Sequence, residues 1–391
     1  MINLRDIIEF LQQYFLDIIR ERRNDSKDKL VKVLLFLFSR IYRRAVQFRI
    51  WLYDKRIFRS RALGCLVVSI GNITCGGTGK TPVVEKFAKT LTQKGRKVAV
   101  LSRGYRSKDR SIPEKIIAMF KSKKSEVPPR IVSDGKHLLL NSLSAGDEPY
   151  MLATNLKDVA VIVDKDRVKS GRYAISDFET DTLILDDGFQ YLDLKPRLNI
   201  LLIDSTDPFD NHHVLPRGLL REPIKNIRRA NYIFLTKSDG SHKINHLKRF
   251  IRRHNKKAEI IECRHKPLYL EDVFNSDEKI ELDYLKNSKI AALSGIANPE
   301  SFENFLDEFG AEIIYRERFA DHHRFEQQEI IDFINKAIKY GAKAVITTEK
   351  DAVRIPRLDR RDIPIFFLRV EIDIISGQES FDQCISRICF S

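Results

Sequence analysis

Short apolar runs alternate with amphipathic segments along most of the chain. Runs typical of buried strands lie at residues 65–70, 97–102, 159–163, 182–186, 198–204 and 232–236. Residues 83–95, in contrast, repeat their apolar side chains at helical spacing and end in glycine. This alternation of strand and helix predicts an α/β fold with largely parallel sheets.

The alternation resumes after a basic segment at residues 242–257, which is typical of an exposed helix face. Further strands are predicted at residues 289–294, 344–351 and 363–372. Helices are predicted from near Ser301 and over residues 327–341. The C-terminal part is therefore expected to be a second α/β unit.

Residues 1–61 have a different pattern, with apolar residues at helical spacing and no strand-like run. Residues 30–61 interleave leucines and aromatic side chains with many arginines. A basic amphipathic helix of this kind suits the surface of a membrane. The alternative is a helix that packs on the protein's own core, and nucleic-acid binding is disfavoured because no recognised motif accompanies the arginines.

The composition narrows the class of protein. The 391 residues suffice for two domains, and 69 Lys and Arg against 54 Asp and Glu give a net charge of +15, which favours anionic partners. Five cysteines without a C-x-x-C pair indicate a reduced, cytoplasmic protein without a thiolate metal site. No apolar run approaches the roughly 20 residues that cross a membrane.

The most informative stretch is residues 69–82, SIGNITCGGTGKTP, between a predicted strand and a predicted helix. Glycines there allow backbone N–H groups to converge on phosphate oxygens, with Lys80 reaching the β- and γ-phosphates and Thr81 holding Mg²⁺. Thr74 stands where the general pattern has glycine. The predicted nucleotide-binding residues are Thr74, Cys75, Gly76, Gly77, Thr78, Gly79, Lys80 and Thr81.

A second stretch, TLILDDGFQ, ends a strand-like run in Asp186 and Asp187. Carboxylates at the C-terminal end of a strand beside a phosphate loop can hold Mg²⁺. A simple Asp-Gly turn is the alternative.

Together these features predict a P-loop NTPase-like α/β/α sandwich with a second, smaller α/β domain and an N-terminal amphipathic helical segment. The expected boundaries are residues 1–61, 62–235 and 236–391. Two other functions fit parts of the pattern: a P-loop GTPase or metallochaperone, suggested by Thr-Lys-Ser-Asp at residues 236–239, and a non-enzymatic protein that binds membranes or nucleic acid.

Several motifs in order resemble the tetraacyldisaccharide 4′-kinase family, the lipid A 4′-kinases of Gram-negative bacteria. They are GNITCGGTGKTP, SRGY, GDEP, LDDGFQ, LPRGLLREP, ALSGIANPESF, FADHHRF and TTEKDAVR, between residues 71 and 354. The family's loop has the same form, including the departure at Thr74. The segment 106–140 looks longer than is usual in the family.

The resemblance implies that the γ-phosphate of ATP passes to the 4′-hydroxyl of a tetraacylated glucosamine disaccharide 1-phosphate, with Mg²⁺ as cofactor. It implies an anionic glycolipid substrate and peripheral attachment to the cytoplasmic face of the bacterial inner membrane through the N-terminal basic segment. We expect a monomer with no nucleic-acid partner.

The resemblance also assigns site residues. Asp147 of GDEP matches the catalytic carboxylate, and His322 of FADHHRF matches the histidine that pairs with it. Because these residues lie in different predicted domains, we expect the second domain to close over the first on ATP binding. The metal ligands implied are Thr81, Asp186, Asp187 and Glu222, and the candidates for phosphate contacts are Arg103, Tyr105, Arg217 and Arg221.

Overall fold

The computed structural model describes residues 14–15, 17–19, 21–22, 25–104, 127–275, 278–359 and 362–390. The chain divides into two compact units, each built from segments that are distant in sequence. The first unit comprises Met1–Lys80, Asp187–Arg264 and Ile374–Ser391, and the second comprises Thr81–Asp186 and His265–Asp373. The expected boundaries at residues 61 and 235 stay a prediction.

The first unit contains a parallel sheet in the order β1-β6-β7-β8. Its strands are β1 (Leu66–Asn72), β6 (Leu198–Asp204), β7 (Tyr232–Thr236) and the beginning of β8 (Glu259–Asp272). Its helices are α2 (Ser26–Asp54), the 3₁₀ helix η1 (Ile224–Arg229), α8 (Lys243–His254) and α12 (Gln378–Cys389). All four strands are rich in buried apolar residues, as expected of a parallel sheet covered on both faces.

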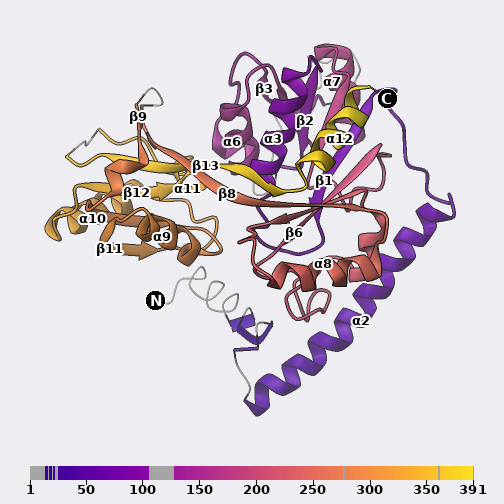
Figure 1. Cartoon of the computed structure of the whole chain (residues 1–391), viewed down its shortest axis with the longest axis horizontal. Coiled ribbons are helices and arrows are strands. Elements are labelled where there is room, and N and C mark those ends of the chain that lie inside the picture. Colours follow the sequence, from indigo (N-terminus) through magenta and orange to yellow (C-terminus); the bar gives the residue numbers. More distant parts are fainter. Residues whose placement is uncertain are drawn as a thin grey trace. The chain divides into compact units, whose positions relative to one another are not determined.

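Side chains of alternating strand residues point to the two faces of this sheet, and α8 and α12 lie on either side of it (Figure 1). Ile233 and Leu235 belong to a core cluster that also contains Ile251 of α8. Phe234, which lies between them in sequence, contacts Phe381 of α12 with the ring centroids 6.3 Å apart. Helices α8 and α12 therefore pack on opposite faces.

The second unit contains two groups of strands. One group is ordered β5-β2-β4-β3, and the other is ordered β11-β10-β12-β13. All pairs within these two groups are parallel except for the antiparallel pair of β3 with β4 at the edge of its group. The strands are β2 (Val98–Ser102), β3 (Arg130–Asp134), β4 (Ala160–Val163), β5 (Thr182–Asp186), β10 (Lys289–Ser294), β11 (Glu312–Arg318), β12 (Ala344–Thr348) and β13 (Ile365–Ser376), with the short β9 (Lys279–Ile280) paired to the end of β8.

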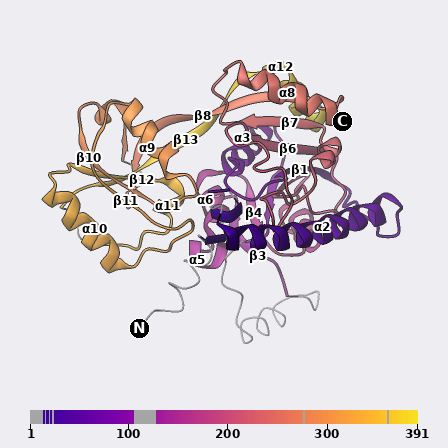
Figure 2. The same ribbon diagram turned by 90° about the horizontal axis from the view of Figure 1, so that it is seen from below.

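The helices of this unit pack on the side chains that alternate between the two faces of its strands. They are α3 (Lys80–Gln93), α5 (Ser142–Ala145), α6 (Asp147–Asn155), α7 (Arg167–Phe178), η2 (Leu282–Leu285), α9 (Pro299–Glu308), α10 (Gln327–Lys339) and α11 (Glu349–Ala352). Val345 belongs to a cluster with Phe333 of α10, whereas Ile346 belongs to one with Leu306 of α9. These two helices cover opposite faces of the β10–β12 layer (Figure 2).

The structure confirms the predicted α/β class, with its P-loop unit, further α/β unit and N-terminal helix. Four strands were missed. No strand is predicted from the sequence of β8, β9 or β11, and β3 lies at the end of a charged, proline-containing stretch after SRGY whose composition predicts a loop. Residues 105–126 of that stretch lie outside the described part of the chain. None of the helices in the described residues combines the length and apolarity that crossing a membrane requires.

Helix α2 has two distinct faces. Its inner face carries the buried Ser39 and Ile50, and the Tyr42 hydroxyl donates to the backbone oxygen of Arg221 at 3.1 Å. Its outer face exposes large apolar side chains at helical spacing, namely Leu30, Val33, Leu34, Leu37, Ile41, Phe48 and Trp51. The two alternatives drawn from the sequence are thus compatible, because one face packs on the protein while the other leaves an apolar stripe exposed.

Candidate active site

The glycine-rich loop follows β1 and has the backbone of a tight turn. A side chain at Gly71 would place its Cβ 2.7 Å from the backbone nitrogen of Phe189, so this position requires glycine. Gly76 and Gly79 have φ angles of +118° and +73°, which L-residues rarely adopt. The sequence GN-x-x-x-GGTGK is therefore dictated by close packing at its beginning and by backbone conformation near its end.

Hydrogen bonds with other segments hold this loop in place. The Cys75 N–H donates to the Leu219 oxygen at 2.7 Å, and the Arg221 N–H donates to the Ile73 oxygen at 2.7 Å. The Thr236 hydroxyl donates to the Thr78 oxygen at 2.9 Å. The Ile73 and Thr78 carbonyls are thus taken by donors from other segments, and an anion would be bound by N–H groups of the glycine-rich part of the loop.

Three predicted residues come together beside the loop. Arg221 Nη1 donates to both carboxylate oxygens of Asp187, at 2.8 and 2.7 Å, and Lys80 Nζ lies 4.0 Å from Asp187 Oδ1. Asp187 itself has φ +54°, the left-handed region. Two cations around one carboxylate leave a net positive charge, which suits the phosphates of a nucleotide.

The other predicted metal ligands have different surroundings. Asp186 is buried at the end of β5, and its Oδ2 accepts from the Ser102 hydroxyl at 2.9 Å. Both carboxylate oxygens of Glu222 accept from Arg229, at 2.7 and 2.6 Å, and one accepts from Asn226. Glu222 therefore stabilises the turn around η1 through these hydrogen bonds. Within the described residues, no three His, Cys, Asp or Glu side chains form a metal-binding group.

The remaining phosphate candidates do not gather at one place. Arg217 is largely buried and donates to Glu21 Oε1 at 2.7 Å, so its charge is already balanced. Arg103 is exposed immediately after β2. Tyr105 lies outside the described residues.

The second cluster is centred on Asp147, the first residue of α6. Its carboxylate accepts from Arg354 Nε at 2.8 Å and from Arg324 Nη2 at 2.9 Å, and it lies 3.4 Å from His322 Nδ1. The preceding Gly146 has φ +91° and ψ +155°, a region accessible essentially to glycine alone. The GDEP motif thus encodes both the carboxylate and the backbone bend that aims it.

The surroundings of Asp147 keep it ionised. Burial alone would raise the pKa of this carboxyl group, but the hydrogen bond with His322 and the charges of Arg354 and Arg324 lower the pKa to about 2. A carboxylate with so low a pKa is a weak proton acceptor. It is better suited to orienting a neighbouring group.

His322 occupies a constrained position. Its φ is +66°, and its N–H donates to the Gly295 oxygen at 3.2 Å. The Nδ1 atom faces Asp147 and lies 3.2 Å from Arg354, whereas Nε2 lies 3.3 Å from Lys350 Nζ. A non-glycine residue held at positive φ in a polar cluster is a typical sign of a functional site.

Comparison with known proteins places these clusters in one family. The family described as Tetraacyldisaccharide-1-P 4′-kinase matches residues 31–389. Tetraacyldisaccharide 4′-kinases of Halothermothrix orenii and Desulfatibacillum aliphaticivorans are 34% and 36% identical to this chain, over 96% and 93% of it and 98% and 95% of their own lengths.

A solved structure agrees with these relatives. The crystal structure of the "apo" form of LpxK from Aquifex aeolicus in complex with ATP superposes with a TM-score of 0.70 at 28% identity. It covers 92% of this chain and 100% of that one. The chain belongs to the tetraacyldisaccharide 4′-kinase family.

Membership in the tetraacyldisaccharide 4′-kinase family confirms the resemblance seen in the motifs and displaces the GTPase alternative. The structure also changes one expectation about the family's paired residues. Asp147 and His322 belong to the same compact unit and are already in contact, so closure of one domain over another is not needed to bring them together.

The residues that hold the pair could not be singled out from the sequence. Arg354, whose side chain is fully buried, contacts Asp147, the Gly295 oxygen and Asp351 Oδ1, the latter two at 3.0 Å. Asp351 in turn accepts from the Gly295 N–H at 3.0 Å. Both residues lie in the family motif TTEKDAVR, so the signal was present, but nothing in the sequence says that an arginine 207 residues away contacts Asp147.

Proposed function

We propose that this protein transfers the γ-phosphate of ATP to the 4′-hydroxyl of a tetraacyldisaccharide 1-phosphate. The observation that carries the proposal is the family match over residues 31–389, which spans both the phosphate loop and the Asp147 cluster. Phosphoryl transfer to an alcohol needs phosphates held in line, charge neutralised and the alcohol positioned. The two clusters supply groups for these tasks.

On the nucleotide side, the loop from Thr74 to Thr81 binds the phosphates of ATP through its backbone and Lys80. Arg221 and Lys80 exchange their contacts with Asp187 for contacts with phosphate oxygens. These cations then neutralise the charge that the transferred group carries.

Mg²⁺ fits the oxygen donors near the loop. The Thr81 hydroxyl and the Asp186 and Asp187 carboxylates are ligands of the hard type that Mg²⁺ prefers. An ion held by these residues would supply positive charge that offsets the negative charge of the phosphates. Glu222, which is engaged by Arg229 and Asn226, is the weakest of the predicted ligands.

On the acceptor side, Asp147 orients His322, and His322 accepts the proton of the 4′-hydroxyl. With its pKa at about 2, Asp147 cannot hold that proton near neutral pH. When Nδ1 of His322 carries a proton toward Asp147, Nε2 is the acceptor nitrogen. Lys350, 3.3 Å from Nε2, places a positive charge beside the group that is deprotonated.

We propose further that the protein attaches peripherally to the cytoplasmic face of the bacterial inner membrane, where its anionic glycolipid substrate would lie. The support is the exposed apolar stripe of α2, whose Leu37 and Ile41 are 55% and 61% exposed, with basic residues beside it. A monomeric state and the absence of a nucleic-acid partner stay predictions.

The deciding experiment follows ³²P from labelled ATP into a detergent-dispersed tetraacyldisaccharide 1-phosphate, with Lys80→Ala as the control. We expect lipid-borne label that disappears in the variant. If the wild type hydrolyses ATP or GTP but labels no lipid, the acceptor assignment is wrong.

Membrane attachment is tested separately by sedimentation with vesicles that contain phosphatidylglycerol. Replacing two side chains of the stripe, Leu37→Ser and Ile41→Ser, should release much of the protein. The matched variant Lys27→Ser and Asp54→Ser changes exposed positions near the ends of the same helix and should stay bound. Equal binding by all three proteins would show that α2 only packs on the protein.

A further inference from the structure

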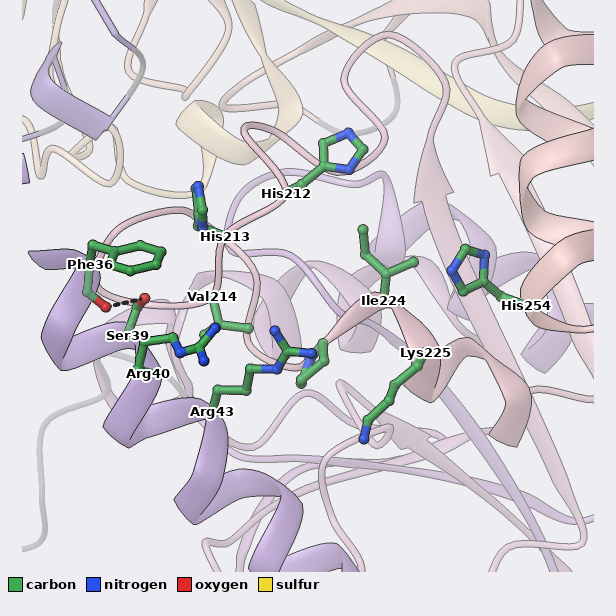
Figure 3. Close-up of a pocket in the computed structure, with 11 residues that line it drawn as sticks. Phe36, Ser39, Arg40, Arg43, His212, His213, Val214, Ile224, Lys225 and His254 are labelled. Carbon is green, nitrogen blue, oxygen red and sulfur yellow. Dashed lines mark hydrogen bonds between the residues drawn. The ribbon is translucent and has the colours of Figure 1, made fainter.

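A pocket of about 330 Å³ lies in the first unit, beside α2 and apart from the residues assigned above (Figure 3). Its walls come from α2, from the loop around His213, from the start of η1 and from the end of α8. A water molecule takes up roughly 30 Å³, so the pocket has room for a phosphate group with part of its substituent.

The polar lining of this pocket is basic. Its nitrogen-bearing side chains are Arg40, Arg43, His212, His213, Lys225 and His254. Figure 3 shows the guanidinium groups of Arg40 and Arg43 extending from α2 to the same side, toward Val214. Among the described residues that line the pocket, none is acidic.

Two acidic groups outside the lining act on it at His213. Glu21 and Asp210 both act electrostatically on His213, but Glu21 is paired with Arg217, and Asp210 accepts from the Leu219 N–H at 3.2 Å. Arg40, Arg43 and Lys225 therefore face the pocket without a carboxylate in its lining. Two planar guanidinium groups with an ammonium group suit a phosphate, which arginine binds through paired N–H donors.

The position of the pocket on α2 indicates where such a phosphate would come from. Phe36, Arg40 and Arg43 follow one flank of the helix at spacings of four and three residues. The exposed Leu37 and Ile41 are their direct neighbours in sequence and belong to the apolar stripe. In a helix whose stripe enters the acyl region of a membrane, this flank lies at the depth of the lipid phosphates.

We propose that this pocket binds the phosphate group of an anionic membrane lipid, at a site separate from the phosphate loop. The inference rests on the proposed attachment of α2 to a membrane. Arg40 and Arg43 would bind the phosphate oxygens, with Lys225 adding charge. The pocket would then fix the depth and rotation of α2 at the membrane, which the apolar stripe alone does not determine.

The test uses the full chain and the emission of Trp51, the single tryptophan of the sequence, which is exposed on the stripe. Its emission should shift to the blue when α2 enters vesicles. The double variant Arg40→Gln/Arg43→Gln is compared with Lys29→Gln/Arg44→Gln, which removes the same charge from exposed positions of α2 outside the pocket. A third variant, Arg40→Lys/Arg43→Lys, keeps the charge but loses the paired donors.

With vesicles of phosphatidylcholine and phosphatidylglycerol, the pocket variant should bind about tenfold more weakly than its matched control, because charge-assisted hydrogen bonds are lost in addition to charge. The lysine variant should also bind more weakly than the wild type. Equal losses in the two glutamine variants, or full binding by the lysine variant, would show only a diffuse electrostatic attraction and overturn the proposal. Thermal unfolding of each variant checks that the exposed substitutions leave the fold intact.

Further measurements identify which molecule supplies the phosphate. In nonionic detergent without phospholipid, a rise in KM for the disaccharide acceptor in the pocket variant would assign the site to the substrate's own phosphate. An unchanged KM with weaker vesicle binding would assign it to a bilayer phospholipid. Inorganic phosphate that raises the thermal stability of the wild type, but not of the pocket variant, would point to free phosphate and overturn the lipid assignment.

These outcomes remain separate from the kinase proposal. The vesicle arm reads Trp51 and needs no turnover, so a protein that labels no lipid can still show a specific pocket. Conversely, a lipid kinase whose pocket variant matches its control would disprove the pocket while the proposed function stands.

Discussion

The phosphate loop and the Asp147 cluster both hold charged groups, but one is a contiguous segment and the other is assembled from distant segments. The loop is a contiguous segment held largely through its own backbone, as in the bonds from Cys75 to Leu219 and from Thr236 to Thr78. The Asp147 cluster is assembled from side chains in three distant segments, with Arg354 fully buried at its centre. The loop therefore depends on backbone conformation, whereas the cluster depends on the balance of buried charges.

The largest expected effect comes from breaking the Asp147–His322 pair. Asp147→Ala should lower kcat by about 10³-fold, within the range typical of positioned acid–base groups, while ATP affinity stays close to that of the wild type. Asp147→Asn, which keeps the shape of the side chain, should lower kcat similarly. Steady-state kinetics and ATP-binding calorimetry make the comparison, and an equal loss of ATP binding would indicate a structural role.

His322→Ala tests whether the pair acts as a unit. The double variant with Asp147→Ala should then be no slower than the slower single variant, since each substitution already removes the shared function. Fully additive losses would show that the two residues work independently.

Replacing the buried Arg354 should lower the free energy of unfolding of the protein. Arg354→Ala would leave Asp147 and Asp351 without their shared cation, and breaking a buried pair in this way typically costs about 3–5 kcal/mol. Arg324→Ala is the matched control, because that side chain is 36% exposed and should cost no more than about 1 kcal/mol. Urea unfolding measures both, and equal losses would contradict the central role of Arg354.

The phosphate loop should instead be sensitive to added volume. Gly71→Ala places a Cβ 2.7 Å from the Phe189 nitrogen, and the resulting strain should lower the free energy of unfolding. We expect a loss of up to about 3 kcal/mol from such overpacking. Gly77→Ala has no heavy atom within 4 Å of the new Cβ and should unfold like the wild type. Similar stability of the two variants would mean that the strand end accommodates a side chain after all.

The smallest effect concerns acid stability. Because the pKa of Asp147 lies at about 2 in the folded protein and at an ordinary value of 3.8 when exposed, its contribution is complete above pH 4 and is lost as the pH falls toward 2. This contribution amounts to about 2 kcal/mol. Asp147→Asn should therefore flatten the fall in stability between these pH values, as measured by urea unfolding. Parallel curves for the variant and the wild type would disprove the charge balance described here.

Features that depend on residues close together in the chain could be predicted before the fold was known. The alternation of apolar runs and amphipathic segments predicted the α/β class, because strands and helices follow from local periodicity. The loop ending in Lys80 and Thr81 could be predicted for the same reason, since its glycines and cation are contiguous. Residues in GDEP and FADHHRF were singled out as a pair by family resemblance, because no local pattern links positions 147 and 322.

The pairing of the remaining charged groups, in contrast, became known only from the folded protein. In the structure, Arg354 and Arg324 form ion pairs with Asp147, and Arg229 forms one with Glu222. Helix α2 has one packed and one exposed face. The fold also places basic residues from four separate segments around one pocket. Such arrangements arise from contacts between segments brought together by folding, and their energies depend on burial and distance, neither of which is written in the order of residues.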